Sequence, residues 1–587
     1  MNNKLIYEED FISEEKPRRS NRLRDPTKLG TSVKQLEHLA NTPQKTRKQR
    51  CREKIDKRTL EAIANALVSG RPVPSTYHQA MQSPEWPKWK TAIEKEIAAI
   101  HRTESLEHVD SLPPGCQGIR CRWVFKIKPE NKQEPEIYKA RLVAQGFRQK
   151  FGIDYEETFA AVAKMTSLRT LVALAASKNS RLTKLDVSNA FLASDIDKDV
   201  YIYPPPGFPP GGFFKLRKAL YGLKQSPRLW FETLTKEFID MGFEPVPTDP
   251  CIFKHKTSLT SILVVVDDCI IEGNDEQLRQ EIEQRLHTKF QIKAFDKVET
   301  FIGLQLEHTP QGIKIHQEQY IVELLAKFGM SECNPCDTPT SPTMQPDHTP
   351  LEHGNSYRNL VGSLLYLLAT RPDICSAVIQ LSRHLEAPTQ GHLNAAKRVL
   401  RYLSGTRRKG VNFQRGATLR LLCFSDSDWA GCHKTRKSTS GYVIYFAGGP
   451  ISWKSKLQQA VALSSCEAEY VALTEVVKEI LWLVRHFKAL GVDLDIPVFV
   501  FGDNTAAIAL AKNPVDHQRT KHIDIKHHFL RDHIKSGTIK LAYVDTKQNI
   551  ADVLTKLTAA PVFKSLVTKL VYTSTSNICN IRSKGGS

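Results

Sequence analysis

The sequence predicts an α+β protein with more than one domain, and three observations support this prediction. The chain has 587 residues, which is enough for three or four domains of roughly 150 residues each. Residues Ser261–Gly273 read SILVVVDDCIIEG, two β-branched apolar runs around adjacent carboxylates, as expected for two short strands joined by an acidic turn. From Leu419 onward, strand-like and helix-like periodicities alternate, which is typical of a further α/β domain.

The N-terminal region is polar and rich in Lys and Arg, so we expect a disordered basic leader over residues 1–75. Its run KTRKQRCREK, Lys45–Lys54, suits a nuclear localisation signal, a nucleic-acid tether or a solvated charge run. The chain has 83 Lys and Arg against 63 Asp and Glu, and its net charge of +20 favours a polyanionic partner. The 12 cysteines show no disulfide framework, which indicates reduced thiols in an intracellular protein.

Beyond the leader, hydrophobic periodicity and proline positions set the expected elements. In chain order these are a helix over 92–100, strands over 122–128 and 138–147, a helix over 167–177, a strand over 182–187 and a helix over 276–290. The Pro-rich segments 203–212 and 334–350 exclude a helix interior or a central strand. Apolar runs such as Ile262–Val266 are far shorter than a membrane span.

Three acids stand at predicted strand ends in the first half of the chain. Asp186 lies near the end of TKLDV, and Asp267 and Asp268 occupy the turn between the two later strands. Adjacent carboxylates in an apolar setting repel each other, and a divalent cation is the simplest compensation. Acids at neighbouring strand ends suit phosphoryl transfer with two Mg²⁺ ions. For an isolated Asp-Asp pair, an exposed turn at a hairpin tip is the alternative.

A second set of acids lies in the C-terminal region. It comprises Asp426 after LRLLCFS, Glu469 in a helical segment, Asp503 after the strand VFVFG and Asp552 at the start of the helical ADVLTK. Asp428 and Glu467 are neighbouring alternatives. We choose Asp426 because it directly follows its strand, and Glu469 because it leads into YVAL.

Longer motifs occur in order along most of the chain. The first half contains YKARLVAQGF, GIDYEETFAAVAK, LDVSNAFL, ALYGLKQSPRLW and VVVDD. The second half contains YRNLVGSLLYLLATRPDI, HLNAAKRVLRYLSGT, SDSDWAGCHKTRKSTSGY, ALSSCEAEYVAL, DNTAAIALAKNPV, HQRTKHIDIKHHF and QNIADVLTK. Between Tyr77 and Lys556 the chain therefore resembles the reverse transcriptase and RNase H portion of copia-type long-terminal-repeat retrotransposon Pol polyproteins.

The resemblance implies a right-hand reverse transcriptase, a connection region and an α/β RNase H-like domain. The implied boundaries are fingers and palm over 76–275, a thumb-like helical region over 276–340, a connection region over 341–417, the RNase H-like domain over 418–560 and a C-terminal tail over 561–587. The implied activities are RNA-directed DNA polymerisation from dNTPs and cleavage of RNA in RNA–DNA hybrids. Two Mg²⁺ ions, replaceable by Mn²⁺, would serve each active site.

The resemblance also assigns roles to individual residues. The polymerase metal ligands would be Asp186, Asp267 and Asp268, and the nuclease metal ligands would be Asp426, Glu469, Asp503 and Asp552. The implied substrate-binding residues are Phe191, whose bulk would exclude a ribose 2′ hydroxyl, Lys139 and Arg141, which would grip the triphosphate, and Gln225, near the nucleotide 3′ position.

Two departures from the family pattern leave an alternative open. Val265 stands where the family usually has an aromatic residue, and Ala161 where it usually has proline. The alternative is a partly decayed copy that retains RNase H activity or only nucleic-acid binding. Thr546 lies where many RNase H domains use a histidine. The nearby histidine-rich run is a family feature, and a separate zinc site there is the weaker interpretation of His522, His527 and His528.

Other residues have structural or electrostatic interpretations. Three tryptophans are expected in the core, namely Trp429, Trp453 and Trp482. A basic cluster is expected either to contact hybrid phosphates or to be a solvated loop, namely Lys434, Arg436 and Lys437.

The implied partners are an RNA template, a DNA or tRNA-like primer, the RNA–DNA hybrid and dNTPs. A homodimer or association with integrase is a further interpretation, and no membrane partner is expected. We expect a cytoplasmic location in a virus-like particle, with nuclear entry through the basic leader. Protease, integrase and nucleocapsid motifs are not found in the sequence. The chain is therefore expected to be the C-terminal portion of a Pol polyprotein, either processed or 5′-truncated, that does not complete transposition alone.

Overall fold

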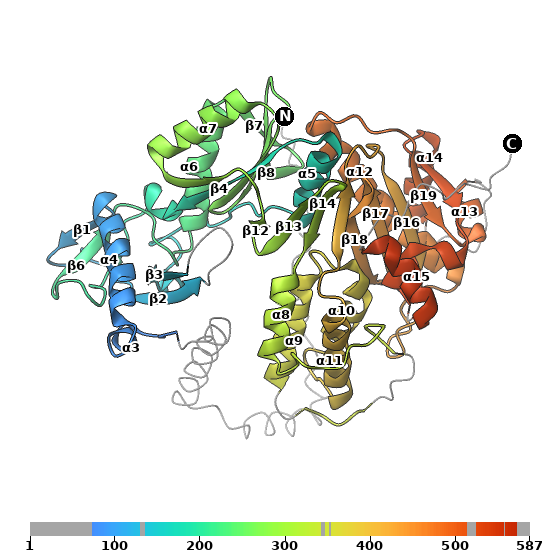
Figure 1. The fold of residues 1–587 in the computed structure, drawn as a ribbon, viewed down its shortest axis with the longest axis horizontal. Coiled ribbons are helices and arrows are strands. Elements are labelled where there is room, and N and C mark those ends of the chain that lie inside the picture. Colours follow the sequence, from blue (N-terminus) through green and yellow to red (C-terminus); the bar gives the residue numbers. More distant parts are fainter. Residues whose placement is uncertain are drawn as a thin grey trace, which may run out of the picture. The chain divides into compact units, whose positions relative to one another are not determined.

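The structure is a computed structural model that describes residues 73–128, 136–341, 347–351, 354–512, 524–556 and 558–571. Nearly all of the predicted leader lies outside these ranges, as does its Lys45–Lys54 run. The described strands form five sheets (Figure 1). None of the described helices combines the length and apolarity that a membrane crossing requires.

The N-terminal part contains two small sheets and the long helix α4. The elements are α3 (Tyr77–Met81), α4 (Trp86–Arg102), β1 (Leu106–Val109), β2 (Cys121–Lys128), β3 (Ile137–Ala144), β5 (Tyr201–Ile202) and β6 (Phe213–Leu216). Strands β2 and β3 form a hairpin whose alternate apolar side chains face α4, where Trp89 packs edge-on against Phe125. The strand predicted to reach residue 147 ends at Ala144. A tight turn follows. At Gly146 the backbone meets the carbonyl of Gly222, which leaves no space for a side chain and therefore requires glycine.

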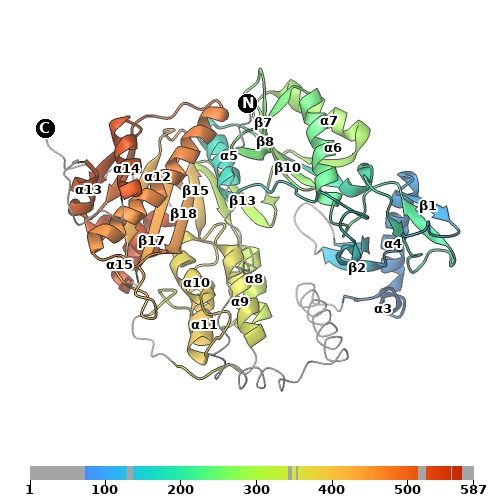
Figure 2. The same ribbon diagram turned by 180° about the vertical axis from the view of Figure 1, so that it is seen from behind.

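A six-stranded antiparallel sheet follows, with the order β11-β4-β10-β9-β8-β7. Its strands are β4 (Leu182–Ser188), β7 (Phe243–Val246), β8 (Asp249–His255), β9 (Ser261–Val265), β10 (Asp268–Glu272) and β11 (Gln291–Phe295). Helix α5 (Met165–Lys178) covers one face, and α6 (Ser226–Asp240) and α7 (Glu276–Lys289) cover the other (Figure 2). The alternation is visible in β9, where Leu263 packs on the α5 side while Ile262 and Val264 pack on the α6 and α7 side.

The middle of the chain differs from its prediction. Residues 276–340 were expected to be helical, but after α7 they form β11, β12 (Thr300–Phe301), β13 (Leu304–Thr309) and β14 (Gly312–His316) before α8 (Glu318–Lys327). Alternating apolar residues around a Pro-containing turn account for the β13–β14 hairpin. Strand β14 also pairs with β15 (Gly410–Gln414), placing Lys314 opposite Asn412. The predicted thumb and connection regions therefore share one sheet.

Four helices gather beside this sheet, namely α8, α9 (Gly354–Leu367), α10 (Cys375–Ser382) and α11 (Gln390–Ser404). A fully buried ion pair stabilises their packing. Arg371 donates from Nε and Nη2 to the two carboxylate oxygens of Asp373, at 2.9 and 2.7 Å. The same carboxylate accepts from the Tyr402 hydroxyl at 2.7 Å, and Arg371 also donates to the Thr406 carbonyl at 2.9 Å.

The C-terminal part has a five-stranded mixed sheet with the order β18-β17-β16-β19-β20. Its elements are β16 (Leu422–Ser427), β17 (Thr439–Phe446), β18 (Gly449–Leu457), α12 (Ser465–Ala489), β19 (Val498–Gly502), α13 (Thr505–Lys512), α14 (Asp524–Lys535), β20 (Ile539–Tyr543) and α15 (Ala560–Leu570). Strands and helices therefore both occur in this part, as the periodicity from Leu419 onward predicted. Residues 561–571 are not a separate tail, because α15 buries Phe563, Leu566 and Leu570 in the core.

The six-stranded sheet's helix α5 also contacts the C-terminal part. Arg169 of α5 is buried and donates to the carbonyl oxygens of Ile451 on β18 and of Ala369, both at 2.7 Å. Its guanidinium lies 3.9 Å from the Trp453 ring. Burial lowers the pKa of Arg169 to about 9. One hydrophobic core continues from α5 through β15 into the five-stranded sheet.

Candidate active sites

The three predicted polymerase acids meet at one edge of the six-stranded sheet. Strands β4 and β10 are antiparallel neighbours, and their register places Asp186 directly opposite Asp268. Val266 and Asp267 form the tight turn between β9 and β10, and Asp267 accepts a backbone hydrogen bond from Val187 at 2.9 Å. The sheet therefore brings together the carboxylates that the sequence separates.

The turn that carries Asp267 has a strained backbone. Val266 has a φ of 56°, in the left-handed region that a β-branched residue rarely occupies. Its carbonyl accepts a hydrogen bond of 2.6 Å from the Trp230 indole on α6, which holds the turn in place. Strain of this kind is concentrated at functional sites.

The charge at this edge is only partly compensated. Arg141 lies 3.7 Å from Asp267, and Lys184 lies 2.8 Å from Asp268. Burial raises the pKa of Asp267, and the neighbouring Asp268 and Asp186 raise it further against the opposing effect of Arg141. These carboxylates are partly buried and repel one another, so their charged forms are unfavourable without a cation. A hard divalent cation, which prefers oxygen ligands, fits such a group.

The predicted nucleotide-binding residues are only partly grouped at this site. Arg141 and Lys139 lie two residues apart on β3 and share one face of the strand. Phe191, 8% exposed, packs edge-on against Tyr221 at 4.7 Å, and Arg141 lies 4.4 Å from the same Tyr221 ring. These contacts form a chain from Phe191 through Tyr221 to Arg141, which lies beside Asp267.

Gln225, which the resemblance places near the nucleotide 3′ position, has hydrogen-bond partners within the protein. Its side chain is fully buried, donates to the Asp154 carbonyl at 2.8 Å and accepts from Gln149 at 2.9 Å. With both amide atoms engaged, Gln225 anchors the loop that precedes α5. A nucleotide contact through this side chain would require breaking those bonds.

Sequence reasoning missed two residues at this site. Tyr221 lies within the quoted motif ALYGLKQSPRLW, but only the fold shows that its ring contacts both Arg141 and Phe191. Glu96 lies on the predicted helix 92–100 and accepts from the Leu142 backbone amide at 3.2 Å. Burial raises the pKa of Glu96 to about 7, although Arg141 and Lys139 oppose the shift.

The second acidic group lies at the end of β16, and it is compact. One carboxylate oxygen each from Asp426, Glu469 and Asp503 lie within 4.8 Å of one another, the one such group among the described residues. Asp426 is on β16, Glu469 is on α12, and Asp503 directly follows β19. Asp552 joins them through Lys556, whose ammonium lies 2.8 Å from Asp426 and 3.4 Å from Asp552. Asp552 begins no α-helix, because residues 550–554 form a 3₁₀ turn.

Burial and mutual repulsion dominate the electrostatics of this group. Both effects raise the pKa of Glu469 and the pKa of Asp552, with Asp426 the main neighbouring charge in each case. Lys556 supplies one positive charge within the cluster. Four carboxylates around a single ammonium leave excess negative charge, so the donor set fits divalent cations.

The alternatives to these acids have other contacts. Asp428 accepts from the Thr439 backbone amide, and Glu467 accepts from the Leu463 backbone amide at 2.7 Å at the start of α12. Thr546, which lies in the region where many RNase H domains use a histidine, donates to Asp503 at 2.8 Å. His522 and the side chain of His527 lie outside the described residues.

The expectation of three core tryptophans is wrong for one of them. Trp429 is 58% exposed, and its indole donates to the Ala462 carbonyl at 3.2 Å. It follows Asp428 in the loop after β16. Trp453 and Trp482 are partly buried, as predicted, against Arg169 and Lys164 respectively.

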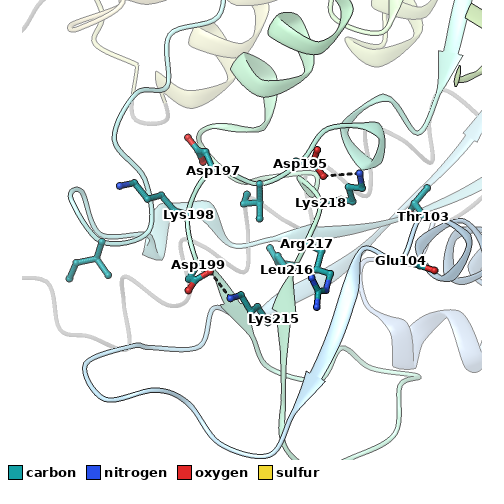
Figure 3. A pocket seen from close by; sticks show the side chains of 12 residues that line it. Thr103, Glu104, Asp195, Asp197, Lys198, Asp199, Lys215, Leu216, Arg217 and Lys218 are labelled. Atoms are coloured by element: carbon teal, nitrogen blue, oxygen red, sulfur yellow. Dashed lines mark hydrogen bonds and ion pairs between the residues drawn. The ribbon is translucent and has the colours of Figure 1, made fainter.

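A charged hollow of about 710 Å³ lies in the N-terminal part, next to β6 (Figure 3). Two of its lysines are paired with its acids, Lys218 with Asp195 at 2.8 Å and Lys215 with Asp199 at 2.7 Å. Because these charges compensate one another, the hollow does not offer the concentrated charge that either carboxylate group has.

Comparison with known proteins defines the class and then the family. A family model described as reverse transcriptase (RNA-dependent DNA polymerase) matches residues 105–342, which contain the first carboxylate group. The chain is 39% identical over 503 residues to the retrovirus-related Pol polyprotein from transposon RE1 of Arabidopsis thaliana, covering 84% of this chain and 34% of that protein. It is 33% identical over 308 residues to the putative transposon Ty5-1 protein of Saccharomyces cerevisiae, covering 50% of this chain and 100% of that protein.

The chain belongs to the copia-type retrotransposon Pol polyproteins and contains their reverse transcriptase domain. It spans about a third of the length of the plant Pol polyproteins that it matches. A solved structure of the foamy viral protease-reverse transcriptase in complex with double-stranded DNA is 15% identical, with a TM-score of 0.47 over 78% of this chain and 70% of that chain.

Proposed function

We propose that this chain extends a primer with dNTPs on an RNA or DNA template, and that its C-terminal part cleaves RNA within RNA–DNA hybrids. The observation that carries the polymerase proposal is the meeting of Asp186, Asp267 and Asp268 at one sheet edge within the matched reverse transcriptase domain. The nuclease proposal rests on the compact group of Asp426, Glu469 and Asp503.

In each site, two Mg²⁺ ions would be held by the carboxylates and would supply Lewis-acid activation of the attacking oxygen and neutralisation of developing charge. The protein's own groups position the substrates. Arg141 has the charge and fork geometry to bind a triphosphate, and Lys139 adds a second cation on the same strand face. Phe191 presents the bulk that would exclude a ribose 2′ hydroxyl.

The nucleic-acid substrates follow from the same proposal. The net charge of +20 favours a polyanionic substrate. An RNA–DNA hybrid would be the product of the proposed polymerase on an RNA template and the substrate of the proposed RNA-cleaving site. Specificity for the RNA strand would come from its 2′ hydroxyls and from the groove shape.

The test is primer extension on poly(rA)/oligo(dT) with Mg²⁺, with DNA synthesis and RNA cleavage scored on the same gel. We expect Asp267→Asn to abolish extension while cleavage persists, and Glu469→Gln to abolish cleavage while extension persists. Matched controls are Asp195→Asn in the charged hollow and Glu467→Gln at the start of α12, which should retain both activities.

The alternative function, a partly decayed copy, is favoured by Val265, which packs beside the turn that carries Asp267. Cleavage without extension would support a nuclease-only copy, and binding with neither activity would contradict both catalytic proposals. Restoring extension by Val265→Tyr would identify that position as the lesion.

A further inference from the structure

Lys184 stands beside the candidate metal ligands of the polymerase site, and the proposed function gives it no role. It precedes Asp186 by two residues on β4, so both side chains lie on the same face of the strand. Its ammonium lies 2.8 Å from Asp268, the carboxylate that faces Asp186 across the β4–β10 pair. On the other side of β4, Lys184 lies opposite Phe295 of β11, whose ring centre is 5.8 Å from the ammonium. The lysine side chain is only 16% exposed, so the sheet surface holds it close to the acids.

The contact with Asp268 compensates charge without satisfying the carboxylate. The Oδ1 atom that faces the ammonium is buried, and no residue that the structure describes donates a hydrogen bond to it. At 2.8 Å the two atoms are close enough for a hydrogen bond, so the direction of approach is what departs from hydrogen-bond geometry. A buried acceptor without a donor is unfavourable and points to a group that binds there. A divalent cation is such a group, because carboxylate oxygens are its preferred ligands.

An ammonium and a divalent cation compete for the same carboxylate. Mg²⁺ holds its oxygen ligands at about 2.1 Å and carries two positive charges. A cation bound by Asp268 would lie within a few ångströms of the Lys184 ammonium at its present position, where the positive charges repel each other. Partial burial weakens the screening of this repulsion by salt. Arg141 differs, because it contacts Asp267 at the longer distance of 3.7 Å and both of those side chains are more exposed.

We propose that Lys184 occupies the place of a divalent cation beside Asp268 and thereby raises the Mg²⁺ concentration that the polymerase site requires. This inference rests on the proposed polymerase function. Without a divalent cation, Lys184 stabilises the ionised Asp268, and when a cation binds, the same ammonium opposes its charge. Lys184 touches no substrate in this proposal and acts through Asp268. Its removal should therefore make the site bind divalent cations more tightly.

The test measures cation binding at each carboxylate group separately. Fe²⁺ bound in place of Mg²⁺ generates hydroxyl radicals with ascorbate and peroxide, and these radicals cleave the backbone next to the ion. Cleavage of the full chain near Asp186 and Asp268 reports the polymerase group, and cleavage near Asp426, Glu469 and Asp503 reports the nuclease group. Added Mg²⁺ suppresses each set of fragments, and the concentration that halves a set measures the affinity of that group.

We expect Lys184→Met to lower the Mg²⁺ concentration that halves cleavage near Asp268 by about tenfold, because a unit charge so close to a divalent ion opposes binding by at least this factor. Cleavage near Glu469 should keep its wild-type Mg²⁺ dependence, which also shows that the variant folds. The Mg²⁺ concentration for half-maximal primer extension on poly(rA)/oligo(dT) should fall as well.

Two variants control for other effects. Lys184→Arg keeps the positive charge, so its Mg²⁺ dependence should stay within about twofold of that of the wild type. Lys256→Met removes the same charge at the edge of the same sheet, where Lys256 pairs with Glu244 at 3.2 Å, and should leave both groups unchanged. Lys256→Met therefore controls for the change in net charge.

The outcomes are distinguishable. An unchanged Mg²⁺ dependence in Lys184→Met would overturn the proposed competition, and so would weaker binding, because Lys184 would then hold Asp268 in place for the cation. An equal change near Asp268 and near Glu469 would overturn it as well. A wild-type chain with neither cleavage near Asp268 nor primer extension would instead overturn the polymerase function on which the inference rests. Tighter binding near Asp268 in Lys184→Met alone would support the proposal.

Discussion

The buried ion pair of Arg371 and Asp373 allows a quantitative test of what stabilises the helices α8 to α11. Both side chains are fully buried, and two parallel hydrogen bonds of 2.9 and 2.7 Å join them. Removing one partner of such a pair leaves an uncompensated buried charge and costs about 3–5 kcal/mol. We therefore expect Arg371→Met and Asp373→Leu each to destabilise this region by about that amount.

The double variant should be much less affected than the sum of the single variants. With both charges gone, the main remaining cost is the Tyr402 hydroxyl, which loses its carboxylate acceptor, at about 1–3 kcal/mol. The coupling energy between the two positions should then be about 3 kcal/mol or more. The free energy of unfolding of this region is measured for the wild type, the two single variants and the double variant by unfolding the full chain in urea. Hydrogen exchange of the α11 amides is the readout. Additive losses would refute this account of the pair.

The same pair gives a pH dependence. Burial alone would raise the pKa of Asp373, but Arg371 and Tyr402 outweigh it and hold the folded-state pKa below its usual range. A lowered folded pKa means that the stabilisation is present above the unfolded value of about 4 and is lost as pH falls through the folded pKa. Protection of the α11 amides should stay constant from neutral pH to about pH 4 and fall below it in the wild type only.

Three further predictions concern the two active sites. Phe191→Ala should raise UTP incorporation relative to dTTP by roughly 10- to 100-fold, measured by single-nucleotide extension, because the ring that would meet the 2′ hydroxyl is gone. Lys556→Met removes the ammonium among the nuclease carboxylates, so the rise in Tm on replacing EDTA with Mg²⁺ should be larger than in the wild type; an unchanged rise would contradict its compensating role. Gly222→Ala should lower dTTP incorporation at least about tenfold and weaken hydrogen-exchange protection of β3, because its Cβ collides with the Ala144 carbonyl; wild-type values would show that the loop is not fixed there.

The sequence was sufficient where local pattern and strand ends determine the outcome. The β-branched runs around Asp267 predicted the β9–β10 hairpin, and the position of Asp186 near a strand end predicted that it would meet the other two acids. The choice of Asp426 over Asp428 followed from its position directly after the predicted strand LRLLCFS, and Asp426 is the one that lies with Glu469 and Asp503.

The remaining features depend on contacts between distant segments. The β14–β15 pairing joins Lys314 to Asn412, and no local periodicity specifies a partner so far along the chain. Which segments pack nearby likewise determines the hydrogen bonds of Gln225 with Gln149 and Asp154, and the exposure of Trp429. Residue type predicted burial for Trp429, and tertiary packing reversed it. The role of Gln225 near the nucleotide came from the family resemblance and stays a prediction, and its partners within the protein could not be predicted from the sequence.

The attachment of α5 to the C-terminal sheet has a consequence for how such an element loses function. Arg169 takes its acceptors from Ile451 and Ala369, and nearly the whole helix is buried. A genomic deletion that removed the C-terminal third would strip the Ile451 acceptor and expose apolar helix surface directly behind the six-stranded sheet. The two sites therefore differ in what inactivates them: a point mutation affects one site, whereas a deletion of the C-terminal segment affects both. A copy with a point mutation in its C-terminal carboxylate group should keep an intact six-stranded sheet, whereas a copy that has lost the C-terminal segment should also lose the proposed DNA synthesis.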